Sequence, residues 1–197
     1  WICDMSINGS PILLGYATPP DNLPNWPAGS TPDLIDGVVL QYQAVGDNNP
    51  NSLGIQGFDV LGRTAVHEIG HYLGLRHIWG DGDCTQDDGI ADTPDATDAS
   101  QQDCDQQKNT CNADVIGLGD LHDMIENYMD YSAETCQNSF TTQQAALMHG
   151  VLENQRYDLV HNNPAGLEEQ IINVSCYPNP TKGEVIVSSA MPMNEIS

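Results

Sequence analysis

The chain has 197 residues, enough for one domain with a buried core and a small appendage. It carries 28 Asp and Glu against 5 Lys and Arg, and the resulting net charge of −23 argues against binding to nucleic acids or anionic membranes. Only 39% of the residues are apolar, and no apolar run is long enough to span a membrane. The acidic excess has two interpretations, solubility or oxygen-rich sites for calcium.

The cysteines indicate an oxidising compartment. There are six, an even number in a short chain, and none lies in a CxxC pair typical of thiolate zinc or redox sites. They predict two or three disulfides and therefore a secreted or cell-surface protein. No leader is visible, and the opening Trp1-Ile2-Cys3 resembles the interior of a strand, so we expect a processed or trimmed start.

The first sixty residues predict short strands separated by loops. Residues 1–16 predict two strand pieces around a turn, and the proline-rich residues 17–33 predict an irregular loop. Residues 36–45, apolar and β-branched at their start, predict the clearest strand. Residues 46–59 are rich in Gly, Asn and Pro and predict another loop.

The remaining elements are fewer and longer. Apolar spacing predicts a helix from residue 61 to about 75, and a second helix over 141–161 that opens with a threonine cap. Residues 78–123 are mostly turn formers and acids, so disulfides or bound ions must supply their order. The last thirty residues predict a strand, a turn and a strand, beyond a boundary near residues 164–167.

The string HEIGHYLGLRH at residues 67–77 predicts a catalytic zinc site. His67 and His71 are four apart and so share one helix face, from which both reach one metal ion. Glu68 is rotated away from the metal and can bond a metal-bound water. Gly74 allows a left-handed turn that returns His77 as the third ligand and leaves the fourth position open. The alternative is a helix with core or solvated histidines.

This string resembles the signature of the metzincin peptidases. That resemblance implies a methionine turn beneath the metal, which Asn127-Tyr128-Met129-Asp130-Tyr131 fits. It implies that Met129 supports the zinc site from below. It further implies that the hydroxyl of Tyr131 lies near the open coordination position, where it stabilises the oxyanion.

Further strings resemble the pappalysin family, including its bacterial members. These are HEIGHYLGLRH, IADTPD, ENYMDYS and CQNSFTTQQAALMH, and the likeness covers roughly residues 1–160. The resemblance implies the disulfides Cys84–Cys111 and Cys104–Cys136, each worth about 3–4 kcal/mol in the chain-entropy model. The pairing of Cys3 and Cys176 stays open.

The same resemblance implies calcium in the irregular lobe. Residues 83–95 contain five carboxylates among turn formers, which suits an oxygen-rich site. The expected ligands are Asp88, Asp92 and Thr93. A solvated acidic loop is the alternative.

Substrate preference depends on one position of the pocket that receives the residue after the scissile bond. Relatives that cleave before Arg or Lys carry an acid just before the cysteine that follows the methionine turn. This chain has Thr135 there, with Glu134 beside it, so a strict preference for basic residues is not expected. The other histidines, His122, His149 and His161, are expected to be structural or exposed.

Residues 173–190 resemble the opening of the C-terminal sorting domain of the type IX secretion system of Bacteroidetes-type bacteria. The string YPNPTKGEV carries the likeness, which implies export through that machinery. The alternative is a β-hairpin packed on the catalytic domain. We therefore expect a catalytic domain over 1–166, with an upper lobe 1–77 and a lower lobe 78–166, followed by the start of a sorting domain over 167–197.

Together these observations predict an α+β metzincin-type fold. A mixed twisted sheet and the active-site helix form its upper lobe, and an irregular lower lobe stapled by disulfides ends in a helix. We expect a monomeric, secreted zinc endopeptidase that hydrolyses proteins with a zinc-activated water and with Glu68 as general base and acid. The alternatives are a catalytically silent zinc- and calcium-stapled binding module and a purely structural protein with a closed zinc site.

Overall fold

Three short strands form the sheet that carries the site. The computed structural model describes residues 1–7, 10–11, 13–27, 36–52, 60–97, 103–113, 117–161, 174–177 and 186–189. Strand β5 (Val38–Gln41) lies in the centre, parallel to β1 (Ile2–Cys3) and antiparallel to β4 (Gly15–Ala17). Strands β2 (Ser6–Ile7) and β3 (Ser10–Pro11) pair in a separate hairpin. The predicted mixed sheet is present with shorter strands than expected, and the two strand pieces expected in residues 1–16 are divided, so that β1 and β4 join the sheet and β2 and β3 form the hairpin.

The strand expected over residues 36–45 is shorter than predicted. After Gln41 the chain turns into a 3-10 helix, η1 (Tyr42–Ala44). This turn buries Ala44, 1% exposed, against Val60. The side chain of Asn49 donates to the carbonyl of Val45 at 3.1 Å, so a carbonyl that leaves the sheet is still satisfied. Packing of Ala44 and this local hydrogen bond outweigh the extended preference of the apolar run.

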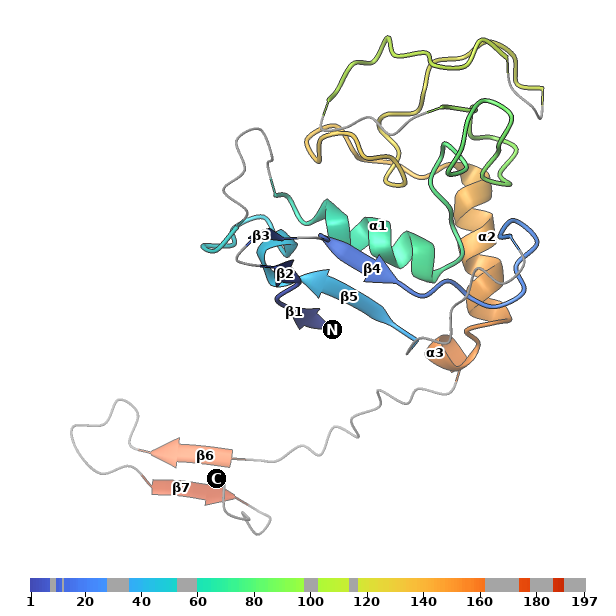
Figure 1. The fold of residues 1–197 in the computed structure, drawn as a ribbon. Coiled ribbons are helices and arrows are strands. Elements are labelled where there is room, and N and C mark those ends of the chain that lie inside the picture. Colours follow the sequence, from blue (N-terminus) through green and yellow to red (C-terminus); the bar gives the residue numbers. More distant parts are fainter. Residues whose placement is uncertain are drawn as a thin grey trace.

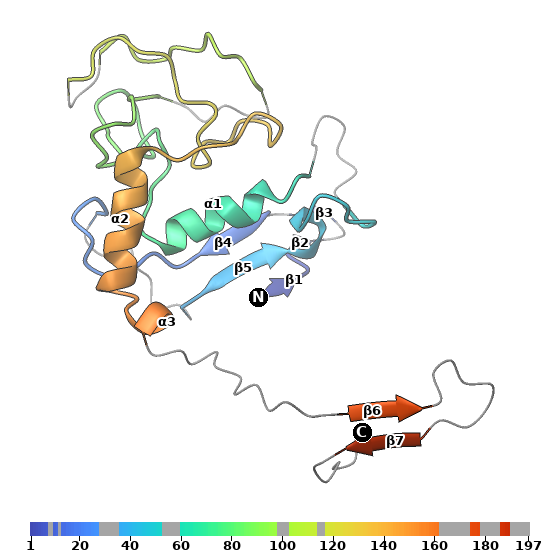
Figure 2. The ribbon, with the colours of Figure 1, turned by 180° about the vertical axis from the view of Figure 1, so that it is seen from behind.

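Helix α1 (Arg63–Tyr72) lies between the sheet and the irregular lobe, as both views in Figures 1 and 2 show. The N-cap residue that precedes it, Gly62, offers no capping side chain. The carboxylate of Glu134 supplies the cap instead, accepting from the backbone N–H groups of Leu61, Arg63 and Thr64 at 2.5, 3.1 and 3.0 Å. Because these N–H groups have no partner within the helix, a carboxylate there is stabilised by hydrogen bonds and by the helix dipole.

The C-terminal end of α1 is closed by a left-handed turn at Gly74, with φ +95°. The N–H of Leu75 donates to Gly70 and that of Gly74 donates to His71, which is the Schellman pattern. The proline-rich loop fastens this turn, because the side chains of Asn25 and Trp26 both donate to the carbonyl of Gly74, at 2.9 and 2.8 Å. The glycine turn is where the sequence predicted it, whereas the helix ends at Tyr72, about three residues before the predicted end.

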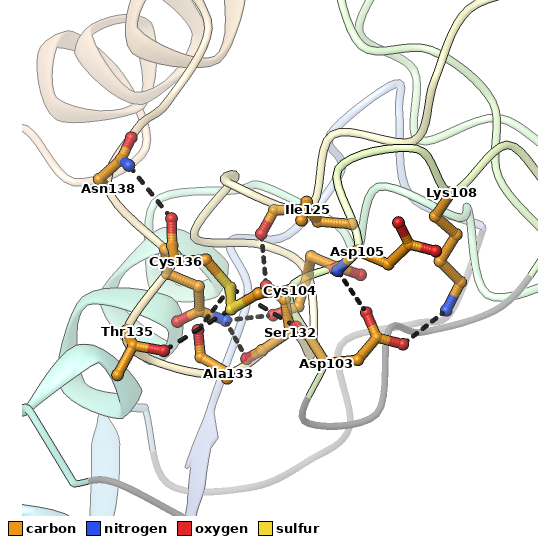
Figure 3. Close-up of a disulfide and its surroundings, with 12 residues drawn as sticks. Asp103, Cys104, Asp105, Lys108, Ile125, Ser132, Ala133, Thr135, Cys136 and Asn138 are labelled. Carbon is orange, nitrogen blue, oxygen red and sulfur yellow. Dashed lines mark hydrogen bonds and ion pairs between the residues drawn. A yellow bond between two sulfur atoms is a disulfide. The ribbon is translucent and has the colours of Figure 1, made fainter.

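The lobe from residue 78 to 140 contains, in its described part, turns and one isolated bridge between Asn127 and Ser139. It holds the disulfides Cys84–Cys111 and Cys104–Cys136. Figure 3 shows Cys104–Cys136 with the ion pair of Lys108 and Asp103 close by. Cys3 is exposed and free among the cysteines whose side chains are described.

The helix expected over residues 141–161 is broken into two. Helix α2 (Thr142–Glu153) begins with a capping box of Thr141 and Gln144, and a separate turn, α3 (Asp158–His161), follows. Arg156 lies between them and explains the break.

The guanidinium of Arg156 donates to both oxygens of Asp36 at 2.8 Å and to the carbonyls of Tyr72 and Thr18 at 2.7 and 2.9 Å. It also lies 3.3 Å from the ring centre of Tyr72. A continuous helix would carry this side chain past its partners, so tertiary contacts override the helical pattern.

Strands β6 (Val174–Tyr177) and β7 (Ile186–Ser189) pair antiparallel in the C-terminal region. The predicted turn between them and the domain boundary at 164–167 lie outside the described residues. Among the helices of the described residues, none has the length and apolarity to cross a bilayer.

Glu134 is expected to be a major contributor to stability. Replacing it by Ala removes the cap of α1 and leaves buried N–H groups without a partner, so the free energy of unfolding should fall by about 1–3 kcal/mol. Urea denaturation followed by circular dichroism measures this change. The control is Glu153→Ala, which removes an exposed pair with His161 and should change stability by less than about 1 kcal/mol. Equal effects of the two changes would contradict the capping role.

Candidate active site

Three imidazole rings converge at the end of α1. The Nε2 atom of His71 lies 3.0 Å from that of His67 and 3.2 Å from that of His77. Two nitrogens bound at 2.0–2.1 Å to a tetrahedral ion are about 3.3 Å apart, so the spacing fits a shared metal. This is the only group of three or more candidate ligand side chains within such reach among the residues that the structure describes.

The other ring nitrogen of each histidine explains why the three can face one another. Each Nδ1 lies beside an oxygen that can only accept: the carbonyl of Tyr128 at 2.7 Å, the carbonyl of Leu75 at 2.9 Å, and the carboxylate of Asp81 at 2.6 Å. The proton of each neutral ring is therefore on Nδ1, and three Nε2 lone pairs point at one place. Such an arrangement is repulsive unless a cation lies between the rings.

The protonation equilibria agree with this arrangement. Burial, together with the charges of His71 and His77, lowers the pKa of His67 well below its usual value. Burial and the charge of His77 lower the pKa of His71 to about 4. Both rings are therefore neutral at pH 7, the form in which imidazole binds a metal.

Glu68 lies beside this cluster and is nearly buried, with 8% of its surface exposed. Burial raises the pKa of its carboxyl group to about 8. Its side chain packs against the edge strand β4, where a Cβ atom added to Gly15 would lie 2.3 Å from its Cγ and 2.4 Å from its Oε1. Gly15 is therefore the residue that leaves room for Glu68, and sequence patterns gave no sign of it.

Tyr131 and Trp79 border the open side of the cluster. The ring centre of Tyr131 lies 5.4 Å from that of His67 and 4.9 Å from that of His77, and 43% of the residue is exposed. Burial, and then the negative charges of Glu68 and Asp81, raise the pKa of Tyr131, so its hydroxyl remains a hydrogen-bond donor at neutral pH. Trp79 stacks on His77 with ring centres 4.2 Å apart.

Met129 packs closely against helix α1. It is fully buried, packs with Leu75 and Ile78, and accepts a backbone hydrogen bond from Ile78 at 3.4 Å. A Cβ atom on Gly70, in the last turn of α1, would lie 2.4 Å from its sulfur. The absent side chain at Gly70 thus allows the turn to approach the helix closely.

Asp81, Trp79 and Gly15 were missed by sequence reasoning. Asp81 and Trp79 follow His77 by four and two residues, so their proximity to the third histidine was a signal that could have found them. Gly15 lies 53 residues before Glu68 in the chain, so their contact becomes apparent only in the folded structure.

The acidic segment contains buried carboxylates. Asp88 is 1% exposed, and its Oδ1 accepts from Ile90 N and from Thr93 Oγ1 at 2.8 and 2.9 Å. The second oxygens of Asp87 and Asp88 are buried and lack a hydrogen-bond partner, as does one oxygen of Asp92. The other oxygen of Asp92 accepts from the backbone N–H of Gln143, in the first turn of α2, at 3.0 Å. Asp88 and Thr93 are thus in contact, whereas Asp92 is directed toward the helix.

Thr135 and Glu134 have different surroundings. Thr135 is exposed and its hydroxyl lies 3.6 Å from the Cys104 sulfur, beside the disulfide shown in Figure 3. Glu134 is 6% exposed and its carboxylate is occupied by the α1 cap and by the Thr64 hydroxyl at 2.8 Å. His161 pairs with Glu153 at the surface. The cluster of groups that could hold a metal includes none of His122, His149 and His161.

Three imidazoles around an open position, with a buried carboxylate beside them, match the donor set of a hydrolytic zinc centre of the kind found in zinc metallopeptidases. Residues 58–153 match the sequence profile of the peptidase family described as Pregnancy-associated plasma protein-A.

Known proteins with similar sequence or structure point the same way. An extracellular metalloprotease of Uncinocarpus reesii is 34% identical over 144 residues, which cover 73% of this chain and 45% of that protein. Another, of Verticillium alfalfae, is 36% identical over 136 residues, which cover 69% and 43%. The structure of mature mirolysin of Tannerella forsythia with a cleaved peptide matches at a TM-score of 0.59 and 34% identity, covering 79% of this chain and 52% of mirolysin.

The chain is thus similar over part of its length to extracellular metalloproteases and to the pappalysin-type peptidase profile, and its α+β fold is similar to that of mirolysin. The chain spans less than half the length of the two curated relatives and about half of the mirolysin chain.

The contact of Gly70 with Met129 gives a matched test on two helix interiors. Gly70→Ala should destabilise the protein by about 1–3 kcal/mol, because the new methyl group collides with a sulfur that is itself fully enclosed. Gly150→Ala, at a position of α2 with no atom within 4 Å of the added Cβ, should instead raise stability by up to about 1 kcal/mol. Thermal unfolding of both variants measures the difference. A stabilising Gly70→Ala would refute the close packing.

Proposed function

We propose that the protein is an extracellular zinc endopeptidase that hydrolyses peptide bonds in proteins. The observation that carries the proposal is the convergence of three Nε2 lone pairs beside the buried carboxylate of Glu68. The names of the curated relatives support an extracellular location. The cleaved peptide bound to mirolysin supports peptides as the substrate class.

His67, His71 and His77 would hold the zinc ion, since their donor atoms fit its size and charge. Bound there, zinc supplies a Lewis acid that polarises a water molecule and the scissile carbonyl group. The remaining steps belong to the side chains of this chain.

Glu68 acts as the proton carrier of the reaction. Its carboxylate accepts a proton from the attacking water and then returns it to the leaving amine. Burial raises the pKa of Glu68 to about 8 when no metal ion is bound. A neighbouring cation lowers this pKa and so favours the charged carboxylate that the first step requires. The hydroxyl of Tyr131 donates to the oxyanion that develops on the substrate carbonyl.

The pocket that receives the residue after the scissile bond has no dedicated acid in this proposal. Glu134 is occupied by the N-terminus of α1, and Thr135 is uncharged. Cleavage is therefore not restricted to bonds before Arg or Lys, although the net charge of −23 attracts cationic substrates over a distance.

Calcium is proposed as a structural ion of the acidic segment. Asp87 and Asp88 each have a buried oxygen without a hydrogen-bond partner, and the charge of Asp87 acts on Asp88. Two neighbouring carboxylates with unsatisfied oxygens suit a hard divalent cation. Asp88 and Thr93 remain proposed ligands together with Asp92, whose free oxygen is also buried.

The C-terminal region is proposed as the start of a sorting domain over residues 167–197, following a catalytic domain over 1–166. Support comes from the YPNPTKGEV string and from the antiparallel pairing of β6 with β7 on either side of it. Export by the type IX machinery is the corresponding proposal for the partner of this region.

Glu68→Gln should reduce hydrolysis of casein or of a mixed peptide library by roughly 10²–10⁴-fold, because the amide cannot accept the proton. Zinc content, measured by elemental analysis, should be unchanged, since Glu68 is not a ligand. A chelator such as 1,10-phenanthroline should abolish the activity of the parent protein, and added zinc should restore it. Glu153→Gln serves as the control and should retain full activity. Activity of Glu68→Gln within tenfold of the parent would refute the role.

Asp88 should make the stability of the metal-free protein depend on pH. Burial, and to a lesser extent the charge of Asp87, raises its pKa to about 7, above the value of about 3.9 expected when unfolded. The folded state therefore holds a proton that the unfolded state loses. The free energy of unfolding should decrease by roughly 2–4 kcal/mol as the pH rises from 4 to 7.

Two comparisons test whether Asp88 causes that pH dependence. Asp88→Asn should flatten the decrease, because its side chain carries no charge at either pH. Calcium should raise the melting temperature more at pH 8 than at pH 5 in the parent, and much less in Asp88→Asn. Calcium stabilisation of equal size in both proteins would place the ion elsewhere.

A further inference from the structure

His77 is held differently from the other two histidines. The Nδ1 atoms of His67 and His71, both on α1, donate to backbone carbonyl groups. His77 lies beyond the helix, in a segment without regular structure, and its Nδ1 donates to the carboxylate of Asp81 at 2.6 Å. The third imidazole therefore depends on side chains for its position, with Trp79 stacked on one face and Asp81 at its edge.

The backbone at Asp81 is in an unfavourable conformation that places its carboxylate beside His77. Its φ angle is +59°, a left-handed value that is uncommon for residues other than glycine, and it follows Gly80 at +58°. Such conformations persist where the surroundings fix them, and they cluster at functional sites. Here the turn is pressed against the backbone of Asp87, since a Cβ atom on Gly80 would lie 2.8 Å from the Asp87 carbonyl carbon.

Arg76 also fixes the turn at Gly80 and Asp81, through its hydrogen bonds. Its guanidinium donates to the carbonyl of Gly80, to the carbonyl of Asp87 at 2.9 Å and to that of Asn25 at 3.4 Å. It also approaches the second oxygen of Asp81 at 3.5 Å, so one carboxylate contacts both Arg76 and His77. The side chain of Arg76 is 11% exposed, and its planar fork matches several acceptors at once.

We propose that Asp81, held by Arg76, is a positioning residue of the zinc centre: its carboxylate fixes the tautomer and the ring orientation of His77. The negative charge also increases the basicity of the Nε2 atom that faces the metal. The proposal rests on the proposed zinc peptidase function, and it adds a residue outside the HExxHxxGxxH string to the centre.

The test measures zinc affinity of the metal-free protein by competition with a chromophoric chelator at pH 7.5. Asp81→Ala removes both the acceptor and the charge and should weaken zinc binding by about 10–100-fold. Asp81→Asn keeps an oxygen acceptor for Nδ1–H and should recover a large part of this loss. The absorption spectrum of the cobalt-substituted protein should change in Asp81→Ala, because His77 is no longer held in one orientation.

The matched control is Asp83→Ala, two residues further along the same turn. Asp83 is exposed, and its carboxylate bonds the backbone and hydroxyl of Thr85. Its removal disturbs the turn locally without touching a histidine, and zinc affinity should stay within twofold of the parent.

A double-mutant cycle tests the part played by Arg76. Arg76→Lys should weaken zinc binding in the parent, because an ammonium group cannot reach the three carbonyls and Asp81 together. In the Asp81→Ala background the same change should have little further effect. Independent, additive effects would show that Arg76 does not act through Asp81.

The outcomes separate this proposal from the proposed function. If Asp81→Ala binds zinc within twofold of the parent, or loses no more than Asp83→Ala, Asp81 has no positioning role even if the protein is a peptidase. If the parent binds zinc tightly and hydrolyses no peptide, the proposed function fails while the affinity comparison still decides the role of Asp81. Should Asp81→Ala be unable to fold, Asp81→Asn tests the charge alone: a loss of zinc affinity that Asp83→Ala does not show supports the role of Asp81, and no loss contradicts it.

Discussion

The turn at Tyr128 and Met129 meets helix α1 directly, and the geometry of the histidine cluster depends on that contact. The Tyr128 carbonyl accepts the Nδ1 proton of His67 at 2.7 Å, while the Met129 sulfur fills the space left by the missing side chain of Gly70. The carbonyl of Met129 also accepts from Ile78, next to the third histidine. One turn therefore sets the position of histidines both on the helix and beyond it, and a displaced turn would misplace both.

Helix α1 is fixed at its two ends by parts of the chain that are distant in sequence. Glu134 from the irregular lobe satisfies the N-terminal N–H groups, and Asn25 and Trp26 from the proline-rich loop hold the turn at Gly74. A helix of ten residues has little stability by itself in water. Anchoring both ends places the histidines and Glu68 without a large hydrophobic core, which agrees with the low apolar content of the chain.

The elements were predicted where local patterns and tertiary contacts agree. The helix after residue 61 and its glycine end are of this kind, since periodicity, spacing and the left-handed turn favour the same structure. The strand expected over 36–45 and the helix expected over 141–161 were too long. In each case a contact between residues far apart in the chain decides where the element ends: Ala44 packs against Val60, and Arg156 pairs with Asp36.

The sequence by itself predicted the three histidines with Glu68 beside them, because a metal centre requires those residue types at fixed spacings, and the resemblance to the metzincins supplied the methionine turn. It also indicated an irregular, disulfide-linked lobe, from its cysteines and turn formers. Only the tertiary structure showed that Gly15 makes room for Glu68, that Glu134 caps α1 and that Asp81 holds His77. The first two contacts join segments that are distant in the chain, and no local pattern of residues records such proximity. Asp81 is only four residues from His77, but the left-handed turn that brings its carboxylate to the ring is held by Arg76 and by the backbone of Asp87.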